Sequence, residues 1–173
     1  MAGDASERLR WVVETLAVQP DEHVLEAGCG HGIAVDLVCE QLTTGTITAL
    51  DRSPKMIDLA TKRNQQLVDA SKAVLITANF HEAVLPRDRY DRIFAVNVAS
   101  FWTKAERDLG RTRELLALDG TLWLFGHGPT EKGTHEFADS VPPILEKHGF
   151  VLKGRIMGEI SAGPIAALQF RPR

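Results

Sequence analysis

Hydrophobic and polar positions alternate along this chain with two different periods. Short runs rich in β-branched residues recur between longer stretches in which apolar residues return every three or four positions. These patterns are typical of buried strands and of amphipathic helices respectively. The predicted strands cover residues 23–27, 46–50, 73–78, 91–98, 121–125, 150–156 and 165–170.

Strands that alternate with helices form βαβ units. The pattern therefore predicts an α/β fold with a doubly wound, mostly parallel, seven-stranded sheet and helices on both faces. The last two strands are joined by a loop that contains glycine, serine and proline. We expect residues 150–156 and 165–170 to form an antiparallel hairpin at the C-terminal edge of the sheet.

The predicted helices are marked by their periodicity and by their ends. Ser53 is placed to cap a helix that starts at Pro54 and reaches about residue 70, because serine accepts hydrogen bonds from free N–H groups and proline fits the first turn. The periodicity also predicts helices at residues 6–18, 33–42 and 104–118, the last of them stopped by a turn at residues 119–120.

Two consecutive prolines belong to the last predicted helix. Proline is tolerated in the first turn of a helix but disrupts its interior. We therefore expect Pro142 and Pro143 to occupy the first turn of a helix that is capped by Ser140 and ended by Gly149.

Composition removes several functional classes. A chain of 173 residues that is 44% hydrophobic suits a single domain over residues 1–173 with a substantial core. The 20 basic and 23 acidic residues give a formal charge of −3 without a basic run, which argues against binding to a nucleic-acid backbone. Cys29 and Cys39 lie in no CxxC or Cys/His cluster, so neither a metal site nor a disulfide framework is expected.

The sequence contains no apolar run of the ~18 residues that a membrane span requires. Residues 1–10 carry charges instead of the apolar core of a signal peptide. We expect a cytoplasmic protein that binds a small molecule, without a membrane or nucleic-acid partner.

A glycine-rich turn follows the first predicted strand directly. Gly28, Gly30 and Gly32 are spaced by one residue, and glycine lets a strand-to-helix turn approach a ligand closely. Such a turn is also compatible with a simple tight connection. The second indication is Asp51, 19 residues after Gly32 at the end of the second strand, because an acid there can accept both hydroxyls of a ribose. Together these features predict a nucleoside cofactor.

Charge indicates which nucleoside cofactor fits. The dinucleotide fingerprint is GxGxxG, whereas Ile33 stands at the third glycine position and Glu26 precedes the turn. A pyrophosphate at ~5 Å would be repelled by this carboxylate by roughly 3 kcal/mol at an effective dielectric constant of ~20. S-adenosylmethionine carries a sulfonium and an ammonium group, so the same carboxylate favours it over NAD. A surface ion pair is the alternative interpretation of Glu26.

The segment Val-Leu-Glu-Ala-Gly-Cys-Gly-His-Gly at residues 24–32 resembles the first motif of the class I S-adenosylmethionine-dependent methyltransferases. The resemblance extends over nearly all of the chain after residue 20. It implies that Asp51 holds the ribose of S-adenosylmethionine and that the methionine end is held by Glu26 and by the turn residues Gly28, Cys29, Gly30 and Gly32.

The resemblance also implies an adenine site. Residues 49–56 resemble the second-strand motif of the family, in which Arg52 and Met56 would lie beside the adenine. Asn79 and Phe80 stand where the family usually has Asp-Ala, and the amide oxygen of Asn79 can accept a hydrogen bond from the adenine amino group. Simple packing of Met56 and a turn at Asn79 are the alternatives.

The remaining candidates concern catalysis and the acceptor. Asn97, the polar residue at the end of an apolar fourth strand, would border the cofactor and the transferred methyl group. Trp102 follows in a loop where the family places residues over the substrate, and packing in the core is its alternative. Trp11 belongs to the N-terminal segment 1–19, the only segment left to form a lid. We expect both tryptophans to contact the substrate.

Methyl transfer from a sulfonium is an in-line displacement, and positioning alone can supply on the order of 7–11 kcal/mol. For an alcohol or phenol, His127 at the end of the fifth strand is the best-placed general base and substrate contact, and an exposed loop histidine is the alternative. The chain lacks both the Asn/Asp-Pro-Pro-aromatic motif of base methylation and an acidic metal-binding pair. We expect a methyltransferase for a small-molecule acceptor, monomeric or homodimeric, that produces S-adenosylhomocysteine; a non-catalytic module that binds the cofactor is the alternative.

Overall fold

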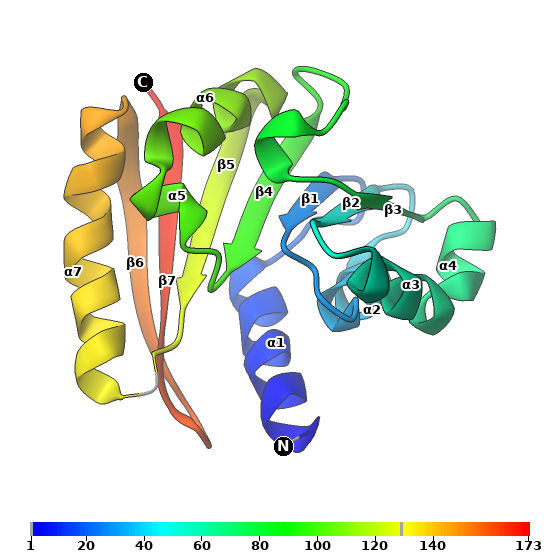
Figure 1. Ribbon diagram of the computed structural model, residues 1–173, viewed down its shortest axis with the longest axis horizontal. Coiled ribbons are helices and arrows are strands. Elements are labelled where there is room, and N and C mark those ends of the chain that lie inside the picture. The colour runs from blue at the N-terminus through cyan, green and yellow to red at the C-terminus, as the bar shows by residue number, and fades with distance from the viewer. Residues whose placement is uncertain (1, 129) are drawn as a thin grey trace.

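The central sheet has the strand order β3-β2-β1-β4-β5-β7-β6 in a computed structural model that describes residues 2–128 and 130–173 (Figure 1). Strands β1 to β5 pair in parallel, whereas β7 is antiparallel to both β5 and β6. The predicted fold class is thus confirmed, including the C-terminal hairpin. The strands are β1 (His23–Ala27), β2 (Thr46–Asp51), β3 (Ala73–Thr77), β4 (Tyr90–Val96), β5 (Leu116–Gly126), β6 (Phe150–Ile160) and β7 (Gly163–Pro172).

Helices cover both faces of this sheet, and each layer encloses its own apolar core. The first layer packs residues such as Val12, Val35 and Ile57 against Phe94 and Phe125 of the sheet. It consists of α1 (Ala2–Leu16), α2 (Ile33–Gln41), α3 (Pro54–Arg63) and α4 (Gln65–Asp69). The opposite layer consists of the 3-10 helix η1 (Phe80–Glu82), α5 (Ser100–Thr103), α6 (Ala105–Leu115) and α7 (Glu131–Lys147).

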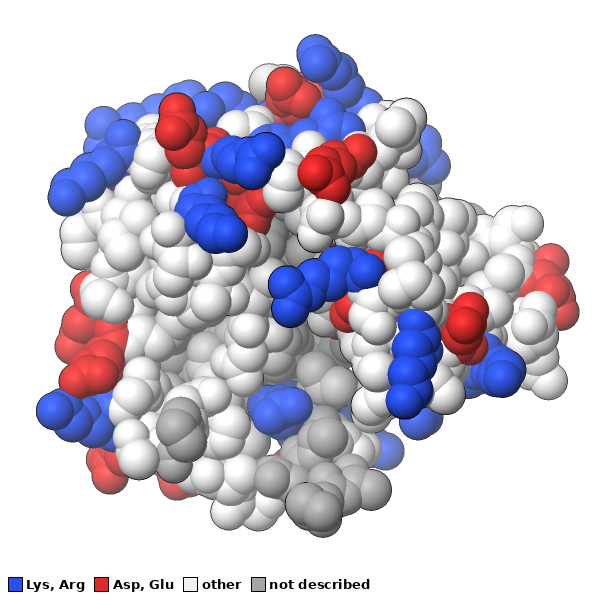
Figure 2. Space-filling view, in the orientation of Figure 1, with Lys and Arg blue, Asp and Glu red and all other residues white. Residues whose placement is uncertain are grey.

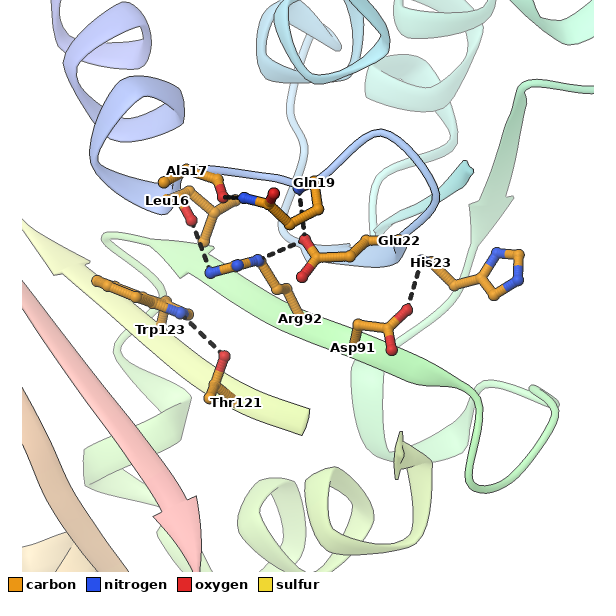
Figure 3. Close-up of polar contacts among 9 residues, drawn as sticks. All are labelled: Leu16, Ala17, Gln19, Glu22, His23, Asp91, Arg92, Thr121 and Trp123. Carbon is orange, nitrogen blue, oxygen red and sulfur yellow. Dashed lines mark hydrogen bonds and ion pairs between the residues drawn. The ribbon is translucent and has the colours of Figure 1, made fainter. Parts of the chain in front are cut away.

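The end of α1 is fixed to the sheet by a polar network (Figure 3). Arg92 of β4 donates from Nε to Glu22 over 2.6 Å and from Nη1 to the Leu16 carbonyl over 2.7 Å. The backbone N–H of His23 donates to Asp91 over 2.7 Å. The N-terminal segment is helical from residue 2, and the end of its helix is fixed to β4, while Met1 lies outside the described residues.

The single helix predicted between Pro54 and residue 70 is wrong, because α3 and α4 are separated at Asn64. The buried Asn64 side chain donates from Nδ2 to the carbonyls of Ala60 and Gly32, each over 2.9 Å. A short polar side chain that bonds nearby backbone competes with helix continuation. At this break, the Asn64 side chain connects the end of α3 to the glycine turn.

The predicted start of α7 is also wrong. Thr130 caps the helix by accepting from the Gly133 N–H over 3.1 Å, and Pro142 and Pro143 lie in the helix interior. A proline cannot donate to the carbonyl four residues earlier, which is Ala138 for Pro142. Arg155 of β6 donates to this carbonyl and, over 2.7 Å, to the Asp139 side chain. Strand β6 therefore satisfies the acceptor that the proline leaves free.

The predicted helix at residues 104–118 ends early, at Leu115. Leu116 already pairs with Tyr90 in the sheet, and Leu118 is fully exposed although it continued the apolar pattern. The turn predicted at residues 119–120 lies within β5 at an irregularity of the strand, because the register with β4 shifts between the pairs Tyr90–Leu116 and Arg92–Thr121. None of the helices in the described part of the chain combines the length and hydrophobicity of a membrane span.

Candidate active site

A cavity of about 520 Å³ opens at the carboxyl ends of β1, β2 and β4. The chain runs outward from β1 to β3 and then returns to place β4 beside β1, and ligands of open α/β sheets bind at such a reversal of strand order. The residues predicted from sequence that line the cavity are Gly28, Asp51, Arg52, Asn79, Phe80 and Asn97.

The glycine turn borders this cavity in a conformation that only glycine adopts readily. Gly28, Gly30 and Gly32 all have positive φ, at 79°, 51° and 72°. A Cβ on Gly28 would approach Val98 within 2.7 Å, and one on Gly32 would approach the Asn64 amide within 2.6 Å. A Cβ on Gly30 would meet no atom within 4 Å. Packing therefore requires two of these glycines, whereas Gly30 faces open space.

Asp51 joins the turn to the end of β2. One carboxylate oxygen accepts from the Gly30 N–H over 3.0 Å, and the other accepts from the Ser53 N–H over 2.9 Å. Each carboxylate oxygen has a second lone pair, so Asp51 can hold the turn and still accept hydroxyl groups from the cavity.

Glu26 is the buried acid beneath the turn. Its side chain is almost fully enclosed, and Oε2 has no hydrogen-bond partner among the described residues. Loss of hydration, with a second contribution from the negative charge of Asp51, raises the pKa of Glu26 to about 8. Burial likewise raises the pKa of the Cys29 thiol, so Cys29 stays protonated. An unpartnered acid oxygen at this position suits a ligand with a positively charged group.

Asn97 and His127 meet at the ends of β4 and β5. The Asn97 Oδ1 accepts from the His127 N–H over 2.9 Å. Because its partner is a donor, the oxygen of the amide must face His127, and Nδ2 is the end that remains for a ligand. The Asn97 backbone has a φ of 56° and donates to the Phe125 carbonyl over 2.9 Å.

The sequence profile of a family described as "Methyltransferase domain" matches residues 25–122, more than half of the chain. The chain belongs to the class I S-adenosylmethionine-dependent methyltransferases. Its match to the malonyl-[acyl-carrier protein] O-methyltransferase of Priestia megaterium has 30% identity over 107 residues, 61% of this chain and 37% of that protein. The matched region thus spans little more than a third of this curated relative.

Solved structures of this family share the fold. A methyltransferase from Aquifex aeolicus superposes with a TM-score of 0.77 and 16% identity, over 94% of this chain and 88% of that one. The magnesium protoporphyrin IX methyltransferase of Synechocystis, with bound S-adenosylhomocysteine, superposes with a TM-score of 0.73 and 17% identity, over 98% and 84% of the two chains. The family cofactor is S-adenosylmethionine, and the unpartnered oxygen of Glu26 and the open side of Gly30 fit it.

Asn79 and Met56, two of the predicted adenine contacts, lie in different surroundings. The exposed Asn79 donates from Nδ2 to Glu82 over 2.7 Å, which leaves its amide oxygen as the acceptor for an adenine amino group. Met56 is half-buried on α3 and is not among the residues that line the cavity. The predicted roles of both residues stay predictions.

The two tryptophans pack against other aromatic rings. Trp11 lies edge-on to Phe125 with ring centroids 6.2 Å apart, and Trp102 lies edge-on to Phe137 at 5.2 Å. Neither tryptophan is among the residues that line the cavity, and neither is His127. Their contact with a substrate stays a prediction.

Sequence reasoning missed one side of the cavity, formed by η1 and α6. Asp108 is buried, and its carboxylate lies 3.4 Å from Nδ1 of His81, while Lys104 and Arg107 line the same side. In the sequence these residues belong to an ordinary charged helix and a loop. Only the tertiary contact of α6 with η1 brings them to the cavity.

Proposed function

We propose that this chain transfers a methyl group from S-adenosylmethionine to a small-molecule acceptor and releases S-adenosylhomocysteine. The observation that carries the proposal is the arrangement of three groups at the ends of β1 and β2. Asp51 lines the cavity, Gly30 donates its backbone N–H to Asp51 and has open space on its own side, and Glu26 is a buried acid whose Oε2 has no partner among the described residues.

The residues that line the cavity and those of the neighbouring turn have separate tasks in binding. Asp51 accepts hydrogen bonds from the ribose hydroxyls, and the amide oxygen of Asn79 accepts one from the adenine amino group. Glu26 balances the positive charge of the methionine end. Gly30 allows close approach because it has no side chain. When bound, S-adenosylmethionine supplies a methyl group on a positively charged sulfur.

The chemistry at the end of β4 and β5 requires positioning and, for a hydroxyl acceptor, removal of one proton. Asn97 can donate from Nδ2 to an acceptor oxygen, but an amide is not a base. His127 is the titratable side chain beside Asn97 and takes the proton. Trp11 and Trp102 are the proposed substrate contacts from the surrounding helices.

The acceptor class follows from the size of the fold and from the relatives. Between the strands, the described residues form no inserted recognition domain, which favours a compact acceptor. The curated relative is named for methylating an oxygen of a malonyl group, and one structural neighbour for acting on magnesium protoporphyrin IX. Cytoplasmic location, and a monomeric or homodimeric state, stay predictions from the sequence.

The experiment is an acceptor screen with S-adenosylmethionine labelled in its methyl group. The panel contains carboxylic acids, including a malonyl thioester, together with phenols and amines, and the readout is labelled product. We expect at least one compact acceptor to be methylated. For a hydroxyl acceptor, His127→Ala should lower turnover by roughly 10²–10⁴-fold, and for a free amine the loss should be much smaller. Tight cofactor binding without transfer to any member of the panel would favour the non-catalytic binding module.

A further inference from the structure

Three elements converge on the side chain of His127 at the end of β5. Nδ1 of His127 lies 2.9 Å from the carbonyl oxygen of Pro164, at the start of β7. Thr134 of α7 donates its hydroxyl to the same carbonyl over 3.1 Å. The Thr134 hydroxyl in turn accepts from the Gly128 N–H over 2.9 Å. The loop that carries His127 is thereby tied to α7 and to the C-terminal hairpin.

The chemistry of these groups fixes the position of each proton. A carbonyl oxygen only accepts, so Nδ1 of His127 must carry a hydrogen, and in the neutral ring Nε2 then holds the lone pair. The Thr134 hydroxyl accepts from a backbone N–H, so its own proton points to Pro164. The carbonyl oxygen of Pro164 has two lone pairs and accepts one hydrogen bond on each.

The surroundings of this network leave the ring little freedom. Thr134 is fully buried, and the backbone N–H of His127 is held by Asn97, which lines the cavity. The ring is thus bound at Nδ1 by Pro164 of β7, and the backbone N–H is bound by Asn97 at the end of β4. Nε2 is the ring atom that this network does not use.

We infer that Thr134 and the Pro164 carbonyl are positioning groups that hold His127 in the Nδ1–H tautomer and present Nε2 as the proton acceptor. The inference rests on the proposed methyl transfer to a hydroxyl acceptor. In that step the hydroxyl proton moves to Nε2, and the acceptor oxygen bonds the methyl carbon. The electron pair of the broken carbon–sulfur bond stays on sulfur. The ring becomes an imidazolium that still donates from Nδ1 to Pro164.

The direct test is the tautomer of His127, measured by ¹⁵N NMR of the imidazole rings at about pH 8.5, where an unperturbed ring is neutral. His127→Gln identifies its signals among the 6 histidines of the chain. We expect a protonated Nδ1 and an unprotonated Nε2 in the wild type. A protonated Nε2, or an average of the two forms, would overturn the inference without any acceptor being known.

The positioning role is tested by Thr134→Val, which keeps the shape and removes the hydroxyl. We expect this variant to show a mixture of tautomers and Thr134→Ser to restore the wild-type signals. The matched control is Thr112→Val, because Thr112 is equally buried and its hydroxyl bonds only the Asp108 carbonyl of its own helix. If Thr134→Val folds and leaves the His127 signals unchanged, the hydroxyl has no positioning role. Should it fail to fold, the tautomer of His127 in the wild type and in Thr134→Ser still tests whether the ring is held with its proton on Nδ1.

Kinetics separate this inference from the proposed function. With a hydroxyl acceptor from the screen, Thr134→Val should lower kcat about tenfold and leave the KM for S-adenosylmethionine unchanged, since neither Thr134 nor Pro164 is among the residues that line the cavity. An unchanged kcat contradicts the inference alone. If no hydroxyl acceptor is methylated although the tautomer is as expected, the proposed proton transfer fails, and the positioning of the ring stands as a structural feature.

Discussion

At the scale of single residues, the site combines two acids that play different parts. Asp51 is half-buried and satisfied by two backbone N–H groups, whereas Glu26 is buried and keeps one oxygen without a partner among the described residues. The pKa of Glu26, raised to about 8 by burial and by Asp51, means that its charged form destabilises the protein before a cationic ligand arrives.

We expect Glu26 to make the ligand-free protein less stable as pH rises from about 4.5 to about 8. In this interval the folded state holds a proton that the unfolded state has lost, so the unfolding free energy falls with pH. Glu26→Gln cannot ionise, and its stability relative to wild type should therefore increase across the interval. Denaturant unfolding at several pH values measures this. Glu40→Gln, at an exposed position on α2, is the matched control, and equal pH profiles for Glu26→Gln and wild type would refute the expectation.

Asp51 is expected to contribute directly to cofactor affinity. Asp51→Ala removes the charge-assisted hydrogen bonds to the ribose, a loss of ~1.5–3 kcal/mol or about 10–150-fold in the dissociation constant of S-adenosylhomocysteine. The same substitution frees the Gly30 and Ser53 N–H groups, so the melting temperature must be recorded with the calorimetric titration. A folded variant with wild-type affinity would remove Asp51 from the ribose site.

The residues that could be predicted share one property. The glycine turn at residues 28–32 directly follows β1, and Asp51 ends β2, so their place at the sheet edge follows from the local sequence. Asn64, Thr134 and Asp108 act through contacts with segments far away in the chain. Their residue types are common in ordinary helices, and nothing in the local pattern distinguishes them.

At the scale of elements, strand pairing and side chains from distant segments set the helix ends that local sequence patterns predicted wrongly. A proline such as Pro142 marks a first turn only if no other group can serve the carbonyl that it leaves free, here that of Ala138. Arg155, on a strand that follows α7 in the chain, supplies the donor. In the same way, pairing of Leu116 with Tyr90 starts β5 where the apolar period still indicated helix.

We expect Arg155→Ala to lower the unfolding free energy by about 1–3 kcal/mol, because the Ala138 carbonyl loses its donor. In a Pro142→Ala background the restored backbone N–H can serve this carbonyl, so Arg155→Ala should cost less there. Chemical denaturation of the four proteins of this cycle gives the coupling. Lys153→Ala, an exposed position on the same strand, is the control. Equal losses in both backgrounds would mean that Arg155 does not replace the hydrogen bond that Pro142 lacks.

At the scale of the whole molecule, the strand order places the carboxyl ends of β1, β2 and β4 around one cavity. The sheet, the hairpin and both helical layers follow from the alternation of periods in the sequence and were predicted. The surface agrees with the composition, because Figure 2 shows Lys and Arg side chains interspersed with Asp and Glu on the face in view. The side of the cavity formed by η1 and α6 depends on the tertiary fold and could not be predicted.

The most direct test of this account is calorimetric titration of S-adenosylhomocysteine into the wild type, Gly30→Ala and Gly149→Ala. Gly30 and Gly149 both have positive φ, at 51° and 77°, so alanine strains the backbone at either position. Of the two, only Gly30 belongs to the glycine turn, where its N–H donates to the cavity-lining Asp51. We predict binding to the wild type and to Gly149→Ala, with at least about tenfold weaker binding to a folded Gly30→Ala. Absence of binding to the wild type, or equal binding to all three proteins, would contradict the assignment of this cavity to the cofactor.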